Sequence, residues 1–382
     1  MHFLFVKDSL VWPRSSGHDV HTYHMLQALA EIGHDVSLCT REQPTADALA
    51  GLELRNTSLW NETQTTAKVP LTRLQERFRS YWGIEEAAIS SIAQRAKECD
   101  ADVVVAVGLE VLPLLAGVKN AARVWYAADE WVWHHLSVVR AADRGTWGHV
   151  RTAAIKGLYE FAYRNVVDRA WVVSEADRRA MQLFARIGHV DVIPNGVDTA
   201  HYAPQTSAEI PNSCVFWGRL DFEPNIQALQ WFCRQVWPRV LELQPTALLR
   251  IFGFQPTDSI RQLANMPGVR LHANVPDLRA EISQSQVVVL PFQSGGGIKN
   301  KLLEAAAMAR PIVCSSRACN GLAIGAEPVM LQAQAPQEWV EQLSLLWAST
   351  ERRRALGEAA RRWVSEAHCW RASAERPERR DG

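Results

Sequence analysis

Three consecutive glycines and two lysines separate a hydrophobic run from a helical pattern in SGGGIKNKLLEAAAMARPIV (294–313). The glycines are Gly295, Gly296 and Gly297. Glycine lets the backbone approach a ligand closely, and a turn between a strand and a helix presents N–H groups to an anion. Lys299 or Lys301 could add a charge-assisted hydrogen bond to a phosphate. The segment therefore predicts a phosphate-binding turn.

Glu304 lies about one turn inside the same predicted helix. Its negative charge makes it unsuitable as a phosphate ligand, but its carboxylate could accept hydrogen bonds from sugar hydroxyl groups. The alternative to a ligand site is a flexible turn with solvated lysines and a surface glutamate. We favour the ligand site because three features with matching chemistry share one strand–helix junction.

A second junction of this kind occurs in VFWGRLDFEPN (215–225), where a strand pattern ends at Gly218 and Arg219. An arginine at the carboxyl end of a strand is suited to bidentate binding of a diphosphate. The spacing supports equally well a surface arginine paired with Asp221 or Glu223.

Two segments in the first half of the chain are weaker candidates. WPRSSGHDVHTYH (12–24) has a strand–loop–helix pattern, and Gly17 in its loop could close over a phosphate. YAADEWVWHHLS (126–137) ends a strand with Asp129, which aromatic residues follow. A carboxylate beside aromatic rings suits sugar binding, and a helix-capping aspartate beside buried tryptophans is an equally good interpretation. The adjacent histidines do not predict a metal site, because neighbouring side chains on a helix point in different directions.

Several reaction classes lack their motifs. The chain has no G-x-S-x-G, no H-E-x-x-H, no Walker-type G-x-x-x-x-G-K-[ST] and no G-x-G-x-x-G turn. The absence of the first three motifs argues against a serine hydrolase, a zinc protease and an NTPase. The absence of the fourth means that the chain has no typical dinucleotide-binding turn.

The composition is that of an ordinary globular protein. Basic and acidic residues both number 41, and this zero net charge argues against a protein that coats nucleic acid. The 7 scattered cysteines include no C-x-x-C pair and predict buried, reduced thiols in a cytoplasmic protein. The N-terminal apolar run is too short for a signal peptide, and no stretch reaches the ~20 apolar residues of a membrane span.

Short β-branched runs alternate with helical patterns along the whole chain, which is typical of parallel α/β sheets. Strands are predicted at 2–6, 34–40, 102–108, 122–128, 169–174 and 190–195, with a helix at 20–32, and the pattern restarts with strands at 213–220, 247–254, 269–274, 286–292 and 311–316. We therefore predict two Rossmann-like, doubly wound domains, at 1–195 and 213–355, joined by a linker at 196–212. A cleft between the carboxyl ends of their strands would hold the ligand.

Taken together, these segments resemble the GT-B-fold retaining glycosyltransferases of glycosyltransferase family 4, the glycogen-synthase-like clan. The resemblance covers nearly the whole chain and is strongest in WVVSEADRRAMQLF…VDVIPNGVDTAHYAP (171–204), GRLDFEPNIQALQWF and KLLEAAAMARPIV. GRLDFEPN, GGGIKNK and YAADEW most resemble bacterial sugar transferases of exopolysaccharide gene clusters. The fold implies a C-terminal helix that crosses back to the first domain. We place this helix at 356–372, with a disordered tail at 373–382.

The resemblance also implies roles for individual residues. The second domain would bind a nucleotide-sugar donor and the first would bind the acceptor. Arg219 matches the arginine on the donor diphosphate, and Glu304 matches the glutamate on the ribose hydroxyls. Asp129 falls near the position that touches the transferred sugar, and Gly17 faces the diphosphate. Backbone contacts around Val275 would select the nucleotide, which we expect to be UDP or GDP.

The chain departs from the family pattern at two positions. The family's first glutamate would fall on Gly296, and the lysine that usually follows the arginine would fall on Pro224. We interpret both changes as marks of the exopolysaccharide subgroup, in which Lys299 or Lys301 supplies the missing cation. The alternative is a catalytically degenerate sugar-nucleotide-binding or scaffold protein.

The expected function is that of a metal-independent retaining hexosyltransferase in polysaccharide or glycoconjugate biosynthesis. It would need no cofactor besides the nucleotide-sugar donor. The acceptor would be a glycan, a lipid-linked molecule or another hydroxyl compound, and no nucleic-acid partner is expected. The oligomeric state is not predicted. A sugar-nucleotide epimerase has the same two-domain layout. An epimerase should carry several acidic and histidine residues in the cleft, however, and the IPNGVD motif of this chain is not typical of epimerases. A two-lobed solute-binding protein is disfavoured because the chain shows no export signal.

We expect a cytoplasmic protein, with one segment that could contact a membrane. LTRLQERFRSYWGIEEA (71–87) carries arginines and aromatic residues that could rest on the inner face of the cytoplasmic membrane. An amphipathic helix that packs on the protein is the simpler interpretation.

Overall fold

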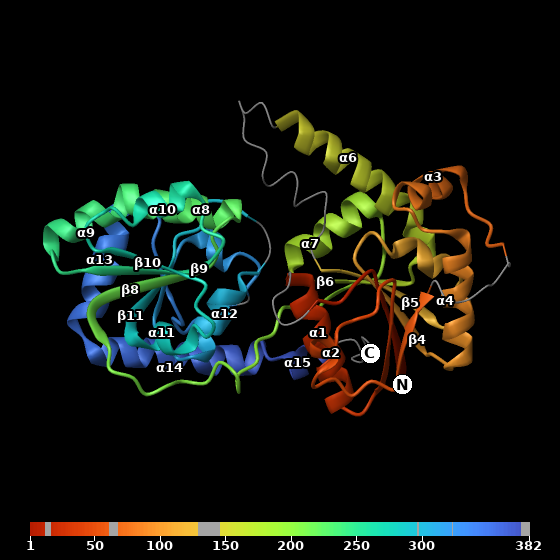
Figure 1. The fold of residues 1–382 in the computed structure, drawn as a ribbon, viewed down its shortest axis with the longest axis horizontal. Coiled ribbons are helices and arrows are strands. Elements are labelled where there is room, and N and C mark those ends of the chain that lie inside the picture. The colour runs from red at the N-terminus through yellow and green to blue at the C-terminus, as the bar shows by residue number, and fades with distance from the viewer. Residues whose placement is uncertain (12–16, 61–67, 129–145, 296–297, 323, 376–382) are drawn as a thin grey trace. The chain divides into compact units, whose positions relative to one another are not determined.

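The computed structural model describes residues 1–11, 17–60, 68–128, 146–295, 298–322 and 324–375. The chain forms two compact units (Figure 1). Unit 1 contains Met1–Asn195 and Trp370–Gly382, and unit 2 contains Gly196–Cys369.

The sheet of unit 1 has seven strands within the described residues, in the order β3-β2-β1-β4-β5-β6-β7. They are β1 (His2–Lys7), β2 (Asp35–Thr40), β3 (Asn56–Leu59), β4 (Val103–Val107), β5 (Ala122–Ala128), β6 (Arg169–Val172) and β7 (Val190–Val192). All neighbouring pairs are parallel. The order reverses direction at β1, so the sheet is doubly wound as predicted, and the carboxyl end of β1 is the place where such sheets bind ligands.

Helices cover both faces of this sheet because alternate side chains of its strands point to opposite sides. Phe3 and Phe5 pack in one hydrophobic cluster with residues of α1, and Leu4 and Val6 pack in another with residues of α4. The helices are α1 (Gly17–Glu31), α2 (Ala46–Leu49), α3 (Arg73–Tyr81), α4 (Glu86–Glu98), η2 (Leu112–Gly117), α6 (Thr146–Tyr163), η3 (Arg164–Val166), α7 (Glu175–Ala180) and η4 (Met181–Ala185). In the part of the chain that is described, no helix has both the length and the apolar composition to cross a bilayer.

The segment proposed for membrane contact (71–87) contains α3, which packs on the protein, and reaches the start of α4. Thr72 and Gln75 form a capping box at the start of α3, and the Gln75 side chain donates a hydrogen bond to the Ala162 carbonyl at 2.9 Å. Phe78 is buried against Tyr159, with ring centroids 4.8 Å apart. The packing interpretation therefore accounts for the buried face of the helix.

The end of the chain returns to unit 1 as α15 (Trp370–Glu375), which packs against α1. The Trp370 ring stacks on His24 with centroids 5.1 Å apart, and the Ser373 hydroxyl donates to the Pro194 carbonyl at 2.9 Å. Of the predicted tail, residues 373–375 belong to this helix, and 376–382 lie outside the described residues.

The crossing helix is shorter than the predicted 356–372. Most of that range belongs to α14 (Thr350–Ala367), which stays in unit 2 and packs on α12 (Asn300–Ala307). A Cβ on Gly357 would lie 2.0 Å from the Ala309 carbonyl oxygen, so the glycine permits this close contact. The helix ends where His368 leaves the helical conformation, and the His368 carbonyl accepts a hydrogen bond from the Val197 N–H at 2.8 Å.

Unit 2 repeats the doubly wound arrangement. Its six described strands are parallel, in the order β10-β9-β8-β11-β12-β13. They are β8 (Ile210–Arg219), β9 (Leu248–Phe254), β10 (Val269–Ala273), β11 (Ser285–Leu290), β12 (Ile312–Cys314) and β13 (Leu331–Gln332). The other helices are α8 (Glu223–Trp231), η5 (Phe232–Val236), α9 (Trp237–Leu243), α10 (Asp258–Leu263), α11 (Arg279–Gln284), η6 (Ser316–Cys319) and α13 (Pro336–Ala348). The helices α8 and α10 lie side by side, as do α12 and α14 (Figure 1).

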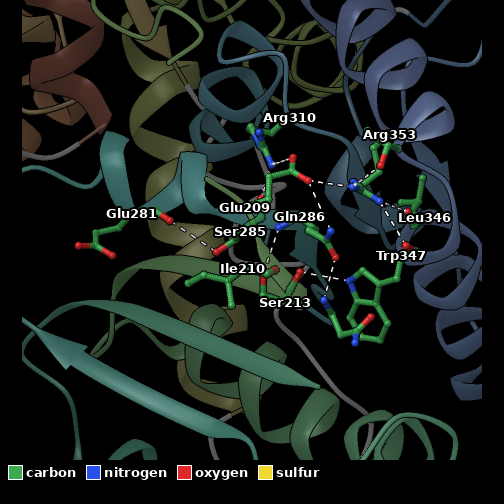
Figure 2. A network of polar contacts seen from close by, with 12 residues as sticks. Glu209, Ile210, Ser213, Glu281, Ser285, Gln286, Arg310, Leu346, Trp347 and Arg353 are labelled. Carbon is green, nitrogen blue, oxygen red and sulfur yellow. Dashed lines mark hydrogen bonds and ion pairs between the residues drawn. The ribbon is translucent and has the colours of Figure 1, made fainter. Parts of the chain in front are cut away.

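A network of ion pairs holds the amino-terminal end of this sheet together (Figure 2). The Glu209 carboxylate binds Arg310 at 3.0 Å and Arg353 at 2.8 Å. Burial would raise the pKa of Glu209, but the charges and hydrogen bonds of the two arginines outweigh it and hold this pKa below its usual value. Arg353 also donates to the carbonyls of Leu346 and Trp347. The network joins the start of β8 to Arg310, two residues before β12, and to the helices α13 and α14.

Candidate active site

The central strand of unit 2, β8, ends in a conformation that requires glycine. Gly218 has φ +138°, and a Cβ at this position would lie 2.7 Å from Lys301 Nζ and 3.2 Å from Asn225 Nδ2. The backbone conformation therefore favours glycine, and a larger residue would also displace the ammonium group of Lys301. The end of β8 and the start of α12 meet at this point.

Lys301 lies in the first turn of α12 and is half-buried. Its Nζ donates to the Asn225 side-chain oxygen at 2.9 Å and lies 4.3 Å from the centroid of the Phe216 ring. Burial lowers the pKa of Lys301 to about 7, although the nearby charge of Glu304 acts to raise it. Its hydrogen-bond partner is a neutral amide rather than a carboxylate, so this site can still accept an anion.

Asn225 links the elements that form the site. It is buried in the first turn of α8, where its Nδ2 donates to the Arg219 carbonyl at 2.7 Å and its Oδ1 accepts from Lys301. Pro224 precedes it, and a Cβ on Gly295 would lie 3.2 Å from the Pro224 ring. The residue at the family's lysine position therefore contacts the glycine-rich turn, in which Gly295 has φ +93°.

Glu304 lies one turn further along α12 and is half-buried. Its carboxylate accepts a hydrogen bond from Trp217 Nε1 at 2.9 Å and another from the Tyr202 hydroxyl. Burial raises the pKa of Glu304, and the hydrogen bonds and the charge of Lys301 only partly oppose this effect. The two hydrogen bonds hold the carboxylate in one orientation while leaving some of its lone pairs for a ligand.

Tyr202 is positioned by the turn at the end of the IPNGVD segment, whose last three residues begin the predicted linker. The Asp198 carboxylate accepts hydrogen bonds from the N–H groups of Ala200 at 2.9 Å and His201 at 2.8 Å. The Asp198 carbonyl accepts from the Tyr202 N–H at 2.9 Å. This turn brings the tyrosine to Glu304, and the negative charge of Glu304 is the main reason that the pKa of Tyr202 is raised.

Arg219 and Lys299 lie at the same end of the sheet but are differently held. Arg219 is the last residue of β8, its side chain is 63% exposed, and it makes a bidentate contact with Asp221 at 3.1 and 2.8 Å. The ion pair raises the pKa of Arg219 and lowers that of Asp221. Lys299 occupies the N-cap position of α12 without a side-chain capping hydrogen bond, and its Nζ lies 5.4 Å from the centroid of the Phe292 ring.

The structure brings one group of the predicted residues together in unit 2. They are Gly218, Arg219, Gly295, Lys299, Lys301 and Glu304. Val275 follows β10 and packs on the core of unit 2, and Gly17 is the first residue of α1 in unit 1. Asp129, Gly296 and Gly297 lie outside the described residues.

Unit 1 also carries a lysine at the carboxyl end of its central strand. Lys7 Nζ binds the Asp19 carboxylate at 2.7 Å and the Ser9 carbonyl at 2.7 Å, and both charged side chains are 9% exposed. A polar cavity of about 280 Å³ lies elsewhere in this unit, lined by His2, Ser37, Arg55, Arg95 and Glu98 among others. His2 uses both ring nitrogens in contacts with the Cys99 carbonyl and the Ser37 hydroxyl, which is a structural role.

Comparison with known proteins gives two family matches. Residues 15–201 match the model for Glycosyltransferase Family 4, and residues 211–349 match the model for Glycosyl transferases group 1. No curated protein sequence matches the chain.

Similar solved structures extend over nearly the whole chain. Sucrose-phosphate synthase from Thermosynechococcus elongatus has a TM-score of 0.70 at 15% identity and covers 99% of this chain and 98% of its own. Anabaena Alr3699/HepE in complex with UDP has a TM-score of 0.66 at 11% identity, with coverages of 99% and 98%. A variant of S. aureus TarM in complex with Fondaparinux, alpha-GlcNAc-glycerol and UDP has a TM-score of 0.70 at 10% identity, with coverages of 99% and 99%. With glycosyltransferase models over both units, this chain belongs to the GT-B-fold glycosyltransferases, with a family 4 domain at 15–201 and a group 1 domain at 211–349.

Proposed function

We propose that this glycosyltransferase moves a sugar from a nucleoside-diphosphate donor to a hydroxyl acceptor, and that unit 2 binds the donor. The observation that carries the proposal is the environment of Lys301, which lies beside Gly218 with a neutral hydrogen-bond partner. A partly buried cation is costly when its direct hydrogen-bond partner is neutral, and the charge of Glu304 only partly offsets this cost. An anionic diphosphate would therefore favour the charged form that burial disfavours. Solved relatives contain UDP and UDP-glucose, and we propose a UDP- or GDP-linked sugar here.

The residues of unit 2 offer a way to stabilise the leaving group. As the glycosidic C–O bond breaks, negative charge develops on the diphosphate, and positioned cations and N–H groups lower the energy of that state. Lys301, Lys299 and the N–H groups of the glycine-rich turn would bind this charge. Arg219 is exposed and could exchange its contact with Asp221 for one with the diphosphate. The protein's own cations would supply this stabilisation without a metal ion.

Glu304 would bind the ribose hydroxyl groups of the donor. Trp217 and Tyr202 occupy two of the roughly four lone-pair positions that a carboxylate offers, and ribose hydroxyls would use the others. In the retaining reaction that we propose, the acceptor hydroxyl attacks from the face that the diphosphate leaves. Its oxygen forms the new C–O bond, and its proton passes to a diphosphate oxygen. Asp129 would position the transferred sugar.

The acceptor that we propose is a glycan or a lipid-linked hydroxyl compound in bacterial polysaccharide or glycoconjugate synthesis. A lipid-linked acceptor would bring the protein to the inner face of the cytoplasmic membrane. The exposed side chain of α3 best suited to such contact is Tyr81, which is 71% exposed.

A protein that binds the nucleotide sugar without transferring it is the second candidate. It is favoured by Pro224, which occupies the family's lysine position and contacts Gly295. The two candidates share the binding site and differ in turnover, so donor hydrolysis or transfer distinguishes them.

The test is a thermal-shift screen of the purified protein against UDP, GDP, ADP, CDP and NAD, each with and without EDTA. Only ligands that bind the folded state raise the melting temperature. We expect one nucleoside diphosphate to raise it in the presence of EDTA, and the matching nucleotide sugar to be hydrolysed slowly or transferred with the anomeric configuration retained, as read by NMR. No shift with any diphosphate would contradict the proposal, and a shift without turnover would favour the second candidate.

A further inference from the structure

Two cysteines of unit 2 face each other across the turn that follows β12. Cys314 is the last residue of β12 and Cys319 is the last residue of η6, and their Sγ atoms are 3.1 Å apart. Both are buried, with exposed fractions of 0% and 9%. A disulfide bond is about 2 Å long, so a movement of about 1 Å would join the two sulfur atoms.

The turn holds this pair in place from both sides. Ser315 caps η6 by accepting a hydrogen bond from the Ala318 N–H at 3.4 Å, and its hydroxyl donates to the Phe292 carbonyl at 2.7 Å. On the other side, Cys319 Sγ contacts Met330 Sδ at 3.4 Å. Because the backbone between the cysteines is fixed by these contacts, the thiols meet as a consequence of the fold.

The two thiols are chemically distinct. The hydrogen bond between them lowers the pKa of Cys319, because it stabilises the thiolate, and raises the pKa of Cys314. Cys319 also retains the greater exposed fraction. Cys319 is therefore the better nucleophile of the pair, and Cys314 is placed to react second.

We propose that Cys314 and Cys319 form a reversible disulfide when the protein meets a small hydroperoxide. The Cys319 thiolate attacks the peroxide, forming an S–O bond and breaking the O–O bond, and the leaving oxygen takes a proton and departs as water or an alcohol. The Cys314 sulfur then attacks the resulting sulfenic acid, so that the S–S bond forms, the S–O bond breaks and water leaves with the Cys314 proton. Two thiols are oxidised and one peroxide is reduced. An external dithiol then reduces the disulfide by thiol–disulfide exchange, which restores the two thiols and leaves the dithiol oxidised.

The disulfide would lie close to the candidate active site. Ser315, between the two cysteines, holds the carbonyl of Phe292, and the ring of Phe292 lies 5.2 Å from Lys301 Nζ. The other described cysteines provide internal comparisons. Cys39, Cys214 and Cys233 are buried, and Cys99 and Cys369 are partly exposed, each outside this pair.

The experiment treats the full-length protein with hydrogen peroxide, blocks free thiols under denaturing conditions and maps tryptic peptides by mass spectrometry. Arg317 lies between the two cysteines, so trypsin leaves them on separate peptides, 302–317 and 318–352, which stay joined only by a disulfide. We expect the joined pair to form with peroxide and to separate after dithiothreitol. A sample in which Cys99 and Cys369 are oxidised shows that the peroxide has acted. If Cys314 and Cys319 in that sample carry the blocking group, and so had stayed free thiols, the proposal is overturned.

The variant Cys314→Ser provides the matched control, since it keeps the nucleophile and removes the second thiol. We expect Cys319 in this variant to proceed to sulfinic acid, whereas the wild-type protein protects it as the disulfide. Circular dichroism and the melting temperature would show that the variant is folded. Equal amounts of sulfinic acid at Cys319 in the wild type and the folded variant would also overturn the proposal.

Discussion

The central strands of the two units end beside lysines with opposite surroundings. In unit 1, Lys7 binds the Asp19 carboxylate at 2.7 Å, and the two charges neutralise each other. In unit 2, Lys301 donates to the amide oxygen of Asn225, and burial lowers its pKa to about 7. The two sheets have equivalent strand orders, so the difference depends on the residue opposite the ammonium group. A carboxylate there makes the lysine part of the fold, whereas an amide leaves its charge for a ligand.

The comparison predicts its largest effect for Lys7→Met. This change removes the Lys7 ammonium group from the buried Asp19 carboxylate, and the removal of one partner of a buried ion pair typically costs about 3–5 kcal/mol. We expect a fall of this size in the free energy of unfolding, measured by urea denaturation. Lys301→Met is the matched variant, and we expect it to change the free energy of unfolding by no more than about 1 kcal/mol, because burial already disfavours that cation. Equal losses in the two variants would contradict the distinction between the lysines.

Lys301→Met should instead affect turnover. Removing one preorganised donor to a developing negative charge lowers the rate by about 10²–10³-fold in other enzymes. We expect a loss of that order in donor hydrolysis or transfer, measured by release of the nucleoside diphosphate. Lys299→Met serves as the comparison, because Lys299 lies at the N-cap position of α12, whereas Lys301 lies beside Gly218. A Lys301→Met protein with wild-type turnover would exclude this lysine from the mechanism.

The pH dependence of donor binding tests whether the charge of Lys301 contributes to binding. In the free protein the Lys301 ammonium is charged below about pH 7 and loses its proton above it. A bound diphosphate favours the charged form, so binding takes up a proton above pH 7, and the affinity falls by about tenfold per pH unit until the pKa of the complex is reached. Below pH 7 the contribution of Lys301 to the affinity should be flat. Calorimetry with a nucleotide sugar in buffers of different ionisation enthalpy measures the proton uptake, and Lys301→Met should abolish it.

The smallest predicted effect concerns Tyr202. Tyr202→Phe removes one hydrogen bond to Glu304, a change worth about 0.5–1.5 kcal/mol. We expect a few-fold loss in nucleotide affinity by calorimetry, because the carboxylate is less firmly oriented. Tyr81→Phe, at an exposed position of unit 1, is the control. An unchanged affinity in Tyr202→Phe would mean that Trp217 alone positions the carboxylate.

Most of the fold could be predicted because its strands are short runs of β-branched residues. The strands that were not predicted, β3 and β13, lack such a run. The edge strand β3 has the sequence NTSL and is largely exposed, and β13 contains only Leu331–Gln332. The end of α14 was also not predictable, since it depends on a contact between His368 and Val197, which lie far apart in the sequence.

Some residues of the candidate site could likewise be predicted from the sequence, and others could not. Gly218, Arg219 and Lys301 could be nominated because residues at the carboxyl ends of parallel strands meet at one edge of the sheet. Asn225, Trp217 and Tyr202 could not, because their roles depend on distant partners, such as the 76 positions between Asn225 and Lys301 and the 87 between Trp217 and Glu304. The segment IPNGVD was noticed as a pattern, and the structure adds that its aspartate shapes the turn that carries Tyr202.

The most direct test of the central claim gives unit 2 the arrangement of unit 1. Asn225→Asp places a carboxylate opposite Lys301, and Asn225→Ser is the control that loses the hydrogen bond to the Arg219 carbonyl without adding charge. The measurement is the affinity of each protein, by calorimetry at pH 7, for the nucleoside diphosphate that gives the largest thermal shift. The account predicts at least about a tenfold weaker affinity for Asn225→Asp than for Asn225→Ser, because the new carboxylate neutralises Lys301 and repels the diphosphate. Equal or tighter binding by Asn225→Asp would contradict the claim that Lys301 keeps its charge for the donor.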